Sequence, residues 1–461
     1  MHKLIAKYGL AAHLAFVAVA PLFLFPYCAE TTIATVLLWL SALALVWMLM
    51  EPETRGLEMP HDARRRVVHR LFNDPFFWAL LTLMVFAGIR ALNTGIAYSY
   101  NSEKGEWYIA KQAMDFFPGS VGSNGYMPFA TIVAFFVVVL GGRHSLGRIG
   151  RVSFLLFSSA LAGIAAIIAI ILINQHQSGV LEAIRFSITD CSFVGVAFGL
   201  HLLGGTATLM SAFELQWNKA MPLFIFAIGG TAVGLFVFAP AYISLSFAAA
   251  EIVLLAYSFC YAAKKLRGTG DFRFLVVFAV SIVVCGLIMY AILPLSTYSA
   301  QLDAYADFEF IDDSFKDFRA LLSNISFLAW KDSPWLGTGI GSFAFDVRTF
   351  ATAKDWEMLV PGIVAVPSGW WQLLVEYGIV GTVAFALPFG FLMFTYVRKL
   401  SYWIPLRVLP GPSCWIFPVA LGAIIANSFF VISLLRADVI LILGAYAAIS
   451  ANAFPKNMER S

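Results

Sequence analysis

One segment of the chain contains three glycines that alternate with other residues, a pattern that can bring the backbone close to a ligand. The segment reads Ser333-Pro-Trp-Leu-Gly-Thr-Gly-Ile-Gly-Ser-Phe343. Because glycine has no side chain, Gly337, Gly339 and Gly341 allow tight turns and a close approach of the backbone to a neighbouring element or a ligand. A nucleotide-binding loop is disfavoured, because no predicted strand precedes the glycines. We predict a structural loop that begins at Pro334 and includes the three glycines.

A helix is predicted immediately before this loop, over 313–330. Its apolar residues recur at intervals of three and four, as in Phe315, Phe318, Leu322 and Ile325, so they share one face of the helix. The surrounding stretch is rich in aromatic residues and is not enriched in the residues typical of disorder. We therefore expect this region to be folded.

The elements that must position this region are predicted to lie in a membrane. The chain has 461 residues, of which 60% are hydrophobic and only 12% are charged, too few to cover a water-soluble fold of this size. Apolar runs of roughly 18 to 22 residues recur, and each is long enough to cross a hydrocarbon core of about 30 Å as a helix. About twelve spans of this kind are expected, at 9–27, 31–50, 75–93, 127–142, 153–173, 191–212, 220–239, 241–262, 274–294, 369–397, 412–434 and 437–454.

The distribution of basic residues predicts that both termini are cytoplasmic. Lys and Arg beside a span are retained on the cytoplasmic side of the membrane, and with both termini inside most of the 30 basic residues fall in cytoplasmic segments. The net charge of +3 therefore reflects the basic residues that orient the spans in the membrane. Because the cationic residues are spread over several loops and both tails, we expect the lipid bilayer as a partner and no nucleic acid.

The sequence thus predicts an all-α integral membrane protein in three parts. Residues 1–294 contain nine spans, with one longer outer loop near 94–126. Residues 295–368 form a large helical outer loop between the ninth and tenth spans, and residues 369–461 contain three spans and a cytoplasmic tail. Long connections are usually functional or disordered, so we expect function to lie in the large loop.

Two segments of the chain carry a resemblance to a known protein family. An arginine at position 319, a helix, Pro334-Trp-Leu-Gly-x-Gly-x-Gly-x-Phe343, and then Trp371-Gln-Leu-Leu-Val-Glu-Tyr-Gly-Ile-Val-Gly381 resemble the signature region of the O-antigen ligase and polymerase family. The resemblance covers 319–385. It implies a protein of the bacterial inner membrane with a large periplasmic loop, which transfers a glycan from undecaprenyl diphosphate to a hydroxyl of an acceptor glycan or glycolipid, without a cofactor.

The resemblance also implies roles for three residues. Arg319 falls where the family places an arginine that holds the donor's diphosphate, and a guanidinium suits this role because it forms paired hydrogen bonds to phosphate oxygens. An ion pair with an acid of the same loop is the alternative. Arg185 is a second candidate for the diphosphate, with a plain interfacial anchor as its alternative. Glu376 matches an acidic position of the family and is expected to orient a neighbouring arginine.

The chain departs from the family just ahead of the second segment. Family ligases have His-Asn or His-Ser there, and the imidazole is proposed to assist the acceptor hydroxyl, whereas this chain has Pro367 and Ser368. Proline cannot accept a proton, so either another group acts as the base, or the acceptor needs little activation, or catalysis has been lost, and the catalytic residue is unknown. The outer-side candidates to replace it are His176, Asp312, Asp313, Asp355 and Glu357. Each also fits an ordinary solvated loop residue, and no acidic cluster with metal-binding spacing is visible.

Two other functions are also compatible with the sequence. A catalytically altered family member that binds a lipid-linked glycan is compatible with the missing histidine. A secondary transporter or flippase is suggested by Glu251 and His201, which fall within predicted spans where ionisable groups are costly. Hydrogen bonds between helices are the favoured explanation of these two residues, and both are expected to face protein.

Overall fold

The described part of the chain is mainly helical. The computed structural model describes residues 2–24, 28–54, 68–69, 71–96, 98–101, 106–109, 118–177, 188–214, 220–239, 241–265, 313–352, 368–403, 411–428 and 436–452. A helix lies at every predicted span except 274–294, which is outside the described residues. These helices are α1 (His2–Leu24), α2 (Glu30–Thr54), α4 (Pro75–Leu92), α5 (Tyr126–Leu140), α6 (Arg148–Gln177), α7 (Ile188–Glu214), α8 (Met221–Phe238), α9 (Ala241–Lys265), α14 (Gly369–Trp403), α15 (Ile416–Ser428) and α16 (Ala437–Asn452).

Within the described residues, 6 helices are long and apolar enough to cross a membrane. They are α2, α4, α5 with the π-helical turn η2 (Gly141–Ser145) that extends it, α6, α9 and α14. Large apolar side chains are exposed on their outer faces, for example Trp39, at 68% exposure, and Leu43 on α2. Such surfaces are stable in lipid and not in water, which supports the expectation of a membrane protein.

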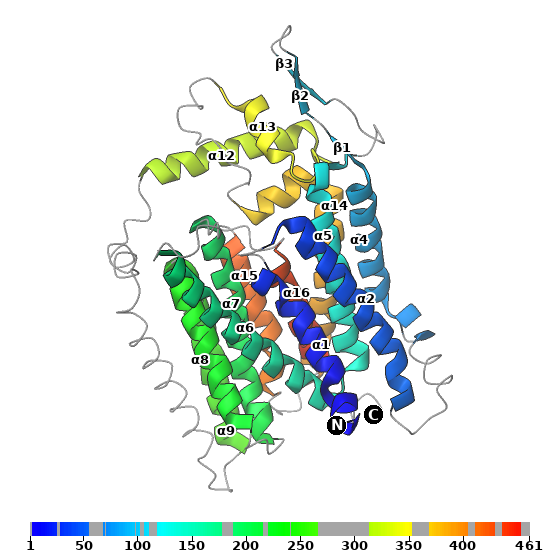
Figure 1. Ribbon diagram of the computed structural model, residues 1–461, viewed down its shortest axis with the longest axis vertical. Coiled ribbons are helices and arrows are strands. Elements are labelled where there is room, and N and C mark those ends of the chain that lie inside the picture. Colours follow the sequence, from blue (N-terminus) through cyan, green and yellow to red (C-terminus); the bar gives the residue numbers. More distant parts are fainter. Residues whose placement is uncertain are drawn as a thin grey trace.

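The helices form a bundle around α16. Residues of this helix from Val439 to Ile449 are almost completely buried, and α16 packs against α1, α5, α7, α14 and α15. On one side α6, α7 and α8 pack together, and small residues permit close approach, since the Cα of Gly230 lies 3.5 Å from where a Cβ on Gly163 would stand. On the other side α4 packs against α5 and α14 (Figure 1).

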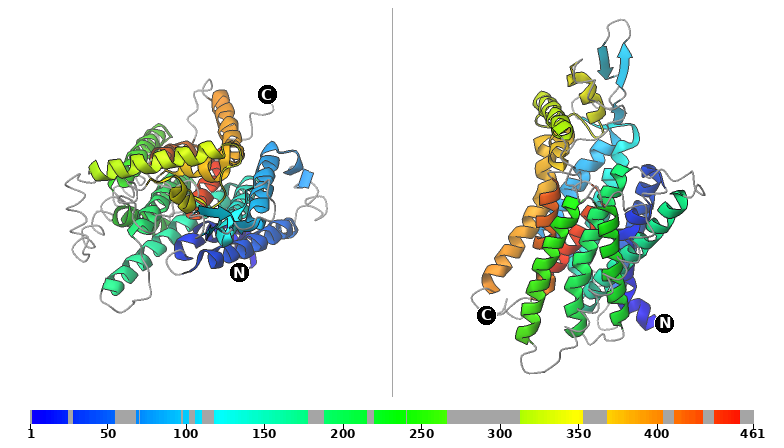
Figure 2. Two further views of the ribbon diagram at one scale, coloured as in Figure 1. Left: turned by 90° about the horizontal axis from the view of Figure 1, so that it is seen from above. Right: turned by 90° about the vertical axis from the view of Figure 1, so that its left-hand side faces the viewer.

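A helical cap covers one end of the bundle. Helix α12 (Asp313–Asp332) lies across the ends of the other helices, and α13 (Phe343–Phe350) packs on it (Figures 1 and 2). The predicted helix is therefore confirmed. Its apolar face is confirmed for Leu322 and Ile325, which form a small core with Ala329 and residues of α13 and α14, whereas the side chains of Phe315 and Phe318 lie outside the described part. The hydrophobic effect on this one face holds α12 against the bundle.

Short strands occur in the outer segment between α4 and α5, so the prediction of an entirely helical chain was incomplete. Strands β2 (Tyr98–Asn101) and β3 (Glu106–Ile109) pair antiparallel and project beyond the cap (Figure 2, right). Strands β1 (Thr94–Ile96) and β4 (Ser120–Val121) pair in parallel. Aromatic and β-branched residues favour strands, but these strands are too short for their periodicity to be recognised.

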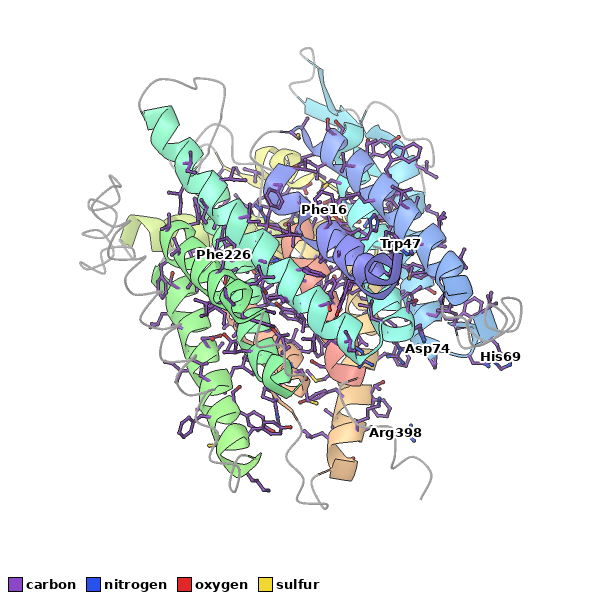
Figure 3. All side chains as sticks on the ribbon, turned by 60° about the horizontal axis from the view of Figure 1, so that its bottom comes forward. Phe16, Trp47, His69, Asp74, Phe226 and Arg398 are labelled. Atoms are coloured by element: carbon purple, nitrogen blue, oxygen red, sulfur yellow. The ribbon has the colours of Figure 1, made fainter. Side chains whose placement is uncertain are left out.

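The opposite end of the bundle carries a charged cluster. Helix α1 begins at this end (Figure 1), and Figure 3 turns it forward, with His69, Asp74 and Arg398 labelled. The Asp74 carboxylate caps α4 by accepting a hydrogen bond from the Phe76 N–H at 3.2 Å. It also accepts from Arg143 at 2.7 Å and lies 3.2 Å from His144 Nε2. Opposite charges therefore connect α4 to η2 at this end.

Candidate functional site

Helix α14 is interrupted near the end that lies beneath the cap formed by α12 and α13. Gly378 has φ 64° and ψ −173°, which is not a helical conformation. In a continuous helix the N–H groups of Ile379 and Val380 would donate to the carbonyls of Val375 and Glu376. The interruption leaves all four groups without these partners, and buried backbone groups in a membrane protein need other ones.

The glycine loop supplies a partner for each of the four groups. Two carbonyls of the loop accept from α14, and two N–H groups of the loop donate to it. The bonds run from Ile379 N to Pro334 O at 2.9 Å, from Val380 N to Trp335 O at 3.0 Å, from Thr338 N to Val375 O at 2.8 Å and from Gly339 N to Glu376 O at 3.2 Å. The loop thus completes the broken helix, and the two segments that carry the family resemblance form one backbone junction.

Two glycines meet at the centre of this junction. Gly337 has φ 73° and Gly378 has φ 64°, a region that residues with a side chain rarely adopt. A Cβ on Gly337 would stand 2.6 Å from both Gly378 N and Val375 O, closer than atoms can pack. The prediction that the glycines permit a close backbone approach is confirmed for Gly337, and the neighbour is α14.

The outer segment before α5 joins the same loop. Ile340 N–H donates to Gly119 O at 3.0 Å, and Val121 N–H donates to Ile340 O at 3.0 Å. Gly341, with φ 77°, packs against Asn124, which leaves no room for a Cβ. The loop is therefore held between α14 on one side and residues 119–124 on the other.

Arg90, in the last turn of α4, lies beneath the loop and is completely buried. Its Nε donates to Pro118 O at 3.0 Å, and its Nη2 donates to Leu336 O at 2.9 Å. The guanidinium carbon stands 5.2 Å from the centre of the Tyr377 ring, within the range of a cation–π interaction. Arg90 therefore connects both outer segments to the bundle, and protein encloses it.

Glu376 is buried beside Arg90. Its Oε2 accepts a hydrogen bond from the Gln372 amide nitrogen at 3.3 Å, and the backbone of Gly341 lies beside the carboxylate. Arg90 attracts this carboxylate electrostatically. The expectation that Glu376 neighbours an arginine thus has a structural counterpart in Arg90.

A second buried carboxylate, Asp346, lies in the first turn of α13. Its Oδ2 is 2.8 Å from the Thr338 hydroxyl and 3.2 Å from the Ser342 hydroxyl, and the two hydroxyl oxygens are 2.6 Å apart. Burial raises the pKa of Asp346 to about 6, with a further contribution from the negative charge of Asp332, although both hydroxyls favour the ionised form. The cap therefore contains a carboxyl that titrates close to neutral pH.

An apolar cavity of about 230 Å³ lies between α14, α15 and α16. Trp370 and Leu373 line it toward the capped end, and Met393 and Leu421 are among the residues deeper in the bundle that line it. The indole nitrogen of Trp370 is buried and has no hydrogen-bond partner among the described residues. The cavity suits a hydrocarbon chain better than a polar ligand.

No protein-family model matches this chain, and no curated protein is significantly similar to it. The resemblance to O-antigen ligases and polymerases therefore rests on the residues of 319–385.

The structure brings together one group of the predicted site residues. Pro334 and the three glycines of the loop lie with Glu376 at the junction. Arg319 and Asp313 lie on α12, and His176 lies in the last turn of α6, but their side chains are outside the described part. The remaining candidates, Asp312, Arg185, Asp355 and Glu357, are outside the described residues, as is Pro367. In the described ranges no group of His, Cys, Asp and Glu is arranged to hold a metal ion.

From the sequence, Arg90 is a candidate for diphosphate binding or for an interfacial anchor, as Arg185 is, and Asp346 is not assigned to any site. Arg90 has a detectable signal, because an arginine in the last turn of an apolar span must find protein partners or reach the headgroups. Asp346 has a weaker one, since an acid after a serine fits the first turn of any helix. Its contact with Thr338 depends on how the glycine loop turns, which is a property of the tertiary structure.

Glu251 and His201 lie in α9 and α7, which are not part of this junction. Glu251 Oε1 accepts a hydrogen bond from the Thr206 hydroxyl at 2.5 Å, between α9 and α7, as expected for a polar contact between helices. His201 is completely buried, and neither ring nitrogen has a hydrogen-bond partner in the described part of the chain. The expectation that both residues face protein is confirmed.

Proposed function

We propose that this protein is an inner-membrane glycosyltransferase of the O-antigen ligase and polymerase type. It would transfer a glycan from undecaprenyl diphosphate to a hydroxyl of an acceptor glycan or glycolipid on the periplasmic face. The observation that carries the proposal is the junction between the glycine loop and α14. The two segments of the family resemblance, which are separate in sequence, exchange four backbone hydrogen bonds at the capped end of the bundle.

The proposed donor site combines a cationic and an apolar part. Arg319, and Arg185 as a second group, would bind the diphosphate and stabilise the negative charge that develops as it leaves. The cavity between α14, α15 and α16 would hold part of the polyprenyl chain, because hydrocarbon side chains line it. A diphosphate is already a good leaving group, so arginines can supply the electrostatic stabilisation that a divalent cation gives elsewhere.

The proposed topology has about twelve spans with both termini in the cytoplasm. Its support is that α1 begins at the end of the bundle opposite to the cap (Figure 1). The cluster of Arg143, His144 and Asp74 also lies at that opposite end (Figure 3). A cap on the periplasmic face would place the junction where lipid-linked glycans are used.

The experiment that tests the proposal measures release of undecaprenyl diphosphate. The purified protein in lipid vesicles is incubated with a defined undecaprenyl-diphosphate glycan and a set of candidate acceptors. Release that depends on the acceptor, and that Arg319→Ala abolishes, is the expected result. Lys331→Ala is the matched control, because Lys331 is an exposed cation on the same helix and should leave release unchanged. Donor binding without release would indicate a catalytically altered member, and no binding would overturn the proposal.

Glu251 and His201 favour a second candidate, a secondary transporter or flippase. Both are ionisable groups inside the bundle, and His201 has no hydrogen bond from either ring nitrogen among the described residues. Proton-dependent movement of a substrate into vesicles, lost in Glu251→Gln and retained in Arg319→Ala, would favour this candidate over the transferase.

A further inference from the structure

Asp346 is a buried carboxylate that the proposed function leaves without a role. Its exposed fraction is 6%, and it stands at the point where the glycine loop enters α13. The hydroxyls of Thr338 and Ser342 both contact the same carboxylate oxygen, Oδ2. Among the described residues no donor contacts Oδ1, so both hydroxyls leave that oxygen to other partners.

A purely structural role explains Asp346 poorly. An asparagine oxygen would accept from the two hydroxyls equally well, without the cost of burying a charge. Among the described residues, the charged group that acts on Asp346 is another acid, Asp332 at the end of α12. Asp346 in turn disfavours the ionised form of Glu376 in α14. Arg90 acts on Glu376. A buried carboxylate among other acids is destabilised, and such arrangements are concentrated at functional sites.

Asp346 is a candidate to replace the family histidine that this chain lacks. Family ligases place a histidine just ahead of the second signature segment, where this chain has Pro367. Asp346 belongs to the loop that completes the break in α14, and its hydroxyl partner Thr338 also donates its N–H to Val375 O in that helix. It therefore lies on the capped side of the same junction. A carboxyl that titrates near pH 6 is ionised at neutral pH and remains basic enough to assist proton transfer.

We infer that Asp346 is the general base of the glycosyl transfer, an assignment that rests on the proposed function. The acceptor hydroxyl oxygen attacks the anomeric carbon of the donor glycan and forms the new glycosidic C–O bond. The bond between that carbon and the phosphate oxygen breaks, and its electron pair leaves with undecaprenyl diphosphate. The hydroxyl proton passes to Oδ1 of Asp346 and then to water. Thr338 and Ser342 hold Oδ2, so they orient the carboxylate as positioning residues.

The test compares pH–rate profiles of glycan transfer by the full-length protein in vesicles. Wild type is expected to lose activity at acidic pH as Asp346 becomes protonated. Asp346→Asn should lower the rate by about 100-fold or more and remove this acidic limb, as expected when a general base is lost. Its binding of the lipid-linked donor should remain, because diphosphate contact is assigned to arginines.

Two variants that keep the carboxylate make the test independent of folding defects in Asp346→Asn. Thr338→Val removes a hydroxyl that favours the ionised form, so the acidic limb should move to higher pH. Asp332→Asn removes a negative charge that disfavours the ionised form, so the limb should move to lower pH. If Asp346 only stabilised the loop, Thr338→Val and Asp332→Asn would not shift the acidic limb of the pH–rate profile in opposite directions.

The outcomes separate this inference from the proposed function. Transfer by wild type with an unchanged pH profile in Asp346→Asn, or the same acidic limb in Thr338→Val and Asp332→Asn, would overturn the inference alone. No acceptor-dependent release by wild type would overturn the proposed function, and the inference with it.

Discussion

Two buried carboxylates at opposite ends of the bundle differ in the groups that hold them. Asp74 is buried, which by itself raises the pKa of its carboxyl, but the hydrogen bond from His144 and the charge of Arg143 outweigh burial and lower it. Asp346 meets two neutral hydroxyls and the negative charge of Asp332, and its pKa is raised to about 6. The partners of the first carboxylate favour its ionised form and so stabilise the fold, whereas the surroundings of the second disfavour its ionised form, as the proposed general base requires.

The two ends also differ in how the chain is held together. At the end with Asp74, side chains of opposite charge connect one helix to a π-helical turn. At the capped end, backbone groups of the glycine loop complete the hydrogen bonding of α14. Backbone contacts of this kind hold the loop close to α14 and leave no room for a side chain between the two segments. Such a rigid arrangement suits a region that positions reactive groups.

The largest expected effect comes from substitutions at the junction. Gly378→Ala requires a positive φ and places a methyl group against the backbone of Gly337 and Trp335, so it should destabilise the cap by more than about 3 kcal/mol. The measurements are thermal unfolding in detergent and proteolysis of the cap. Gly390→Ala is the matched control, because nothing lies within 4 Å of a Cβ at that position of the same helix. Equal behaviour of the two variants would contradict a close backbone junction.

The next effect concerns Arg90. Arg90→Lys cannot reproduce both hydrogen bonds, to Pro118 O and Leu336 O, and should cost about 2–4 kcal/mol because buried polar groups lose their partners. Hydrogen exchange of the loop is expected to increase at 334–341. Arg398→Lys, at an exposed position of α14, should change neither quantity. An unaltered exchange pattern in Arg90→Lys would show that the junction holds the loop without the guanidinium.

A smaller effect is expected at the opposite end. Asp74→Asn should lower stability by about 2 kcal/mol, because it removes an N-terminal cap and an ion pair. Since the pKa of Asp74 is lowered in the folded protein, its contribution is present above pH 3.8 and is lost as the pH falls below that value. Measuring the free energy of unfolding of wild type and Asp74→Asn as a function of pH checks this dependence. Glycan transfer should be unaffected, and a loss of transfer without a loss of stability would remove the functional distinction between the two ends.

The smallest effect is the pH dependence of the cap itself. The pKa of Asp346 is higher in the folded protein than in the unfolded chain, so the folded state binds an extra proton between about pH 6 and 3.8. Stability of the cap should therefore rise by about 1 kcal/mol as the pH falls from 7 to 5, which is the reverse of the trend for Asp74. Hydrogen exchange of α13 measures it, and Asp346→Asn should remove the dependence.

The sequence predicted the elements of the cap better than their connections. The helix over 313–330 was predicted because its apolar positions repeat with helical spacing, and the structure has α12 at Asp313–Asp332. In contrast, the break in α14 has no reliable signal, because glycines such as Gly378 are common in membrane helices. The role of Asp346 depends on Thr338, and a loop of unknown path gives no such pairing.

By itself, the sequence determined which segments are apolar helices, where the ionisable residues fall along them, and that the three glycines of the loop permit a close approach of the backbone. These are consequences of local composition and period, which act over a few residues. Only the tertiary structure decided that the glycine loop completes the broken helix, that Arg90 lies beneath it, and that Asp346 meets the hydroxyls of Thr338 and Ser342 through one carboxylate oxygen. Those facts depend on contacts between residues far apart in the chain, whose partners are chosen by burial and by the need to satisfy every buried polar group.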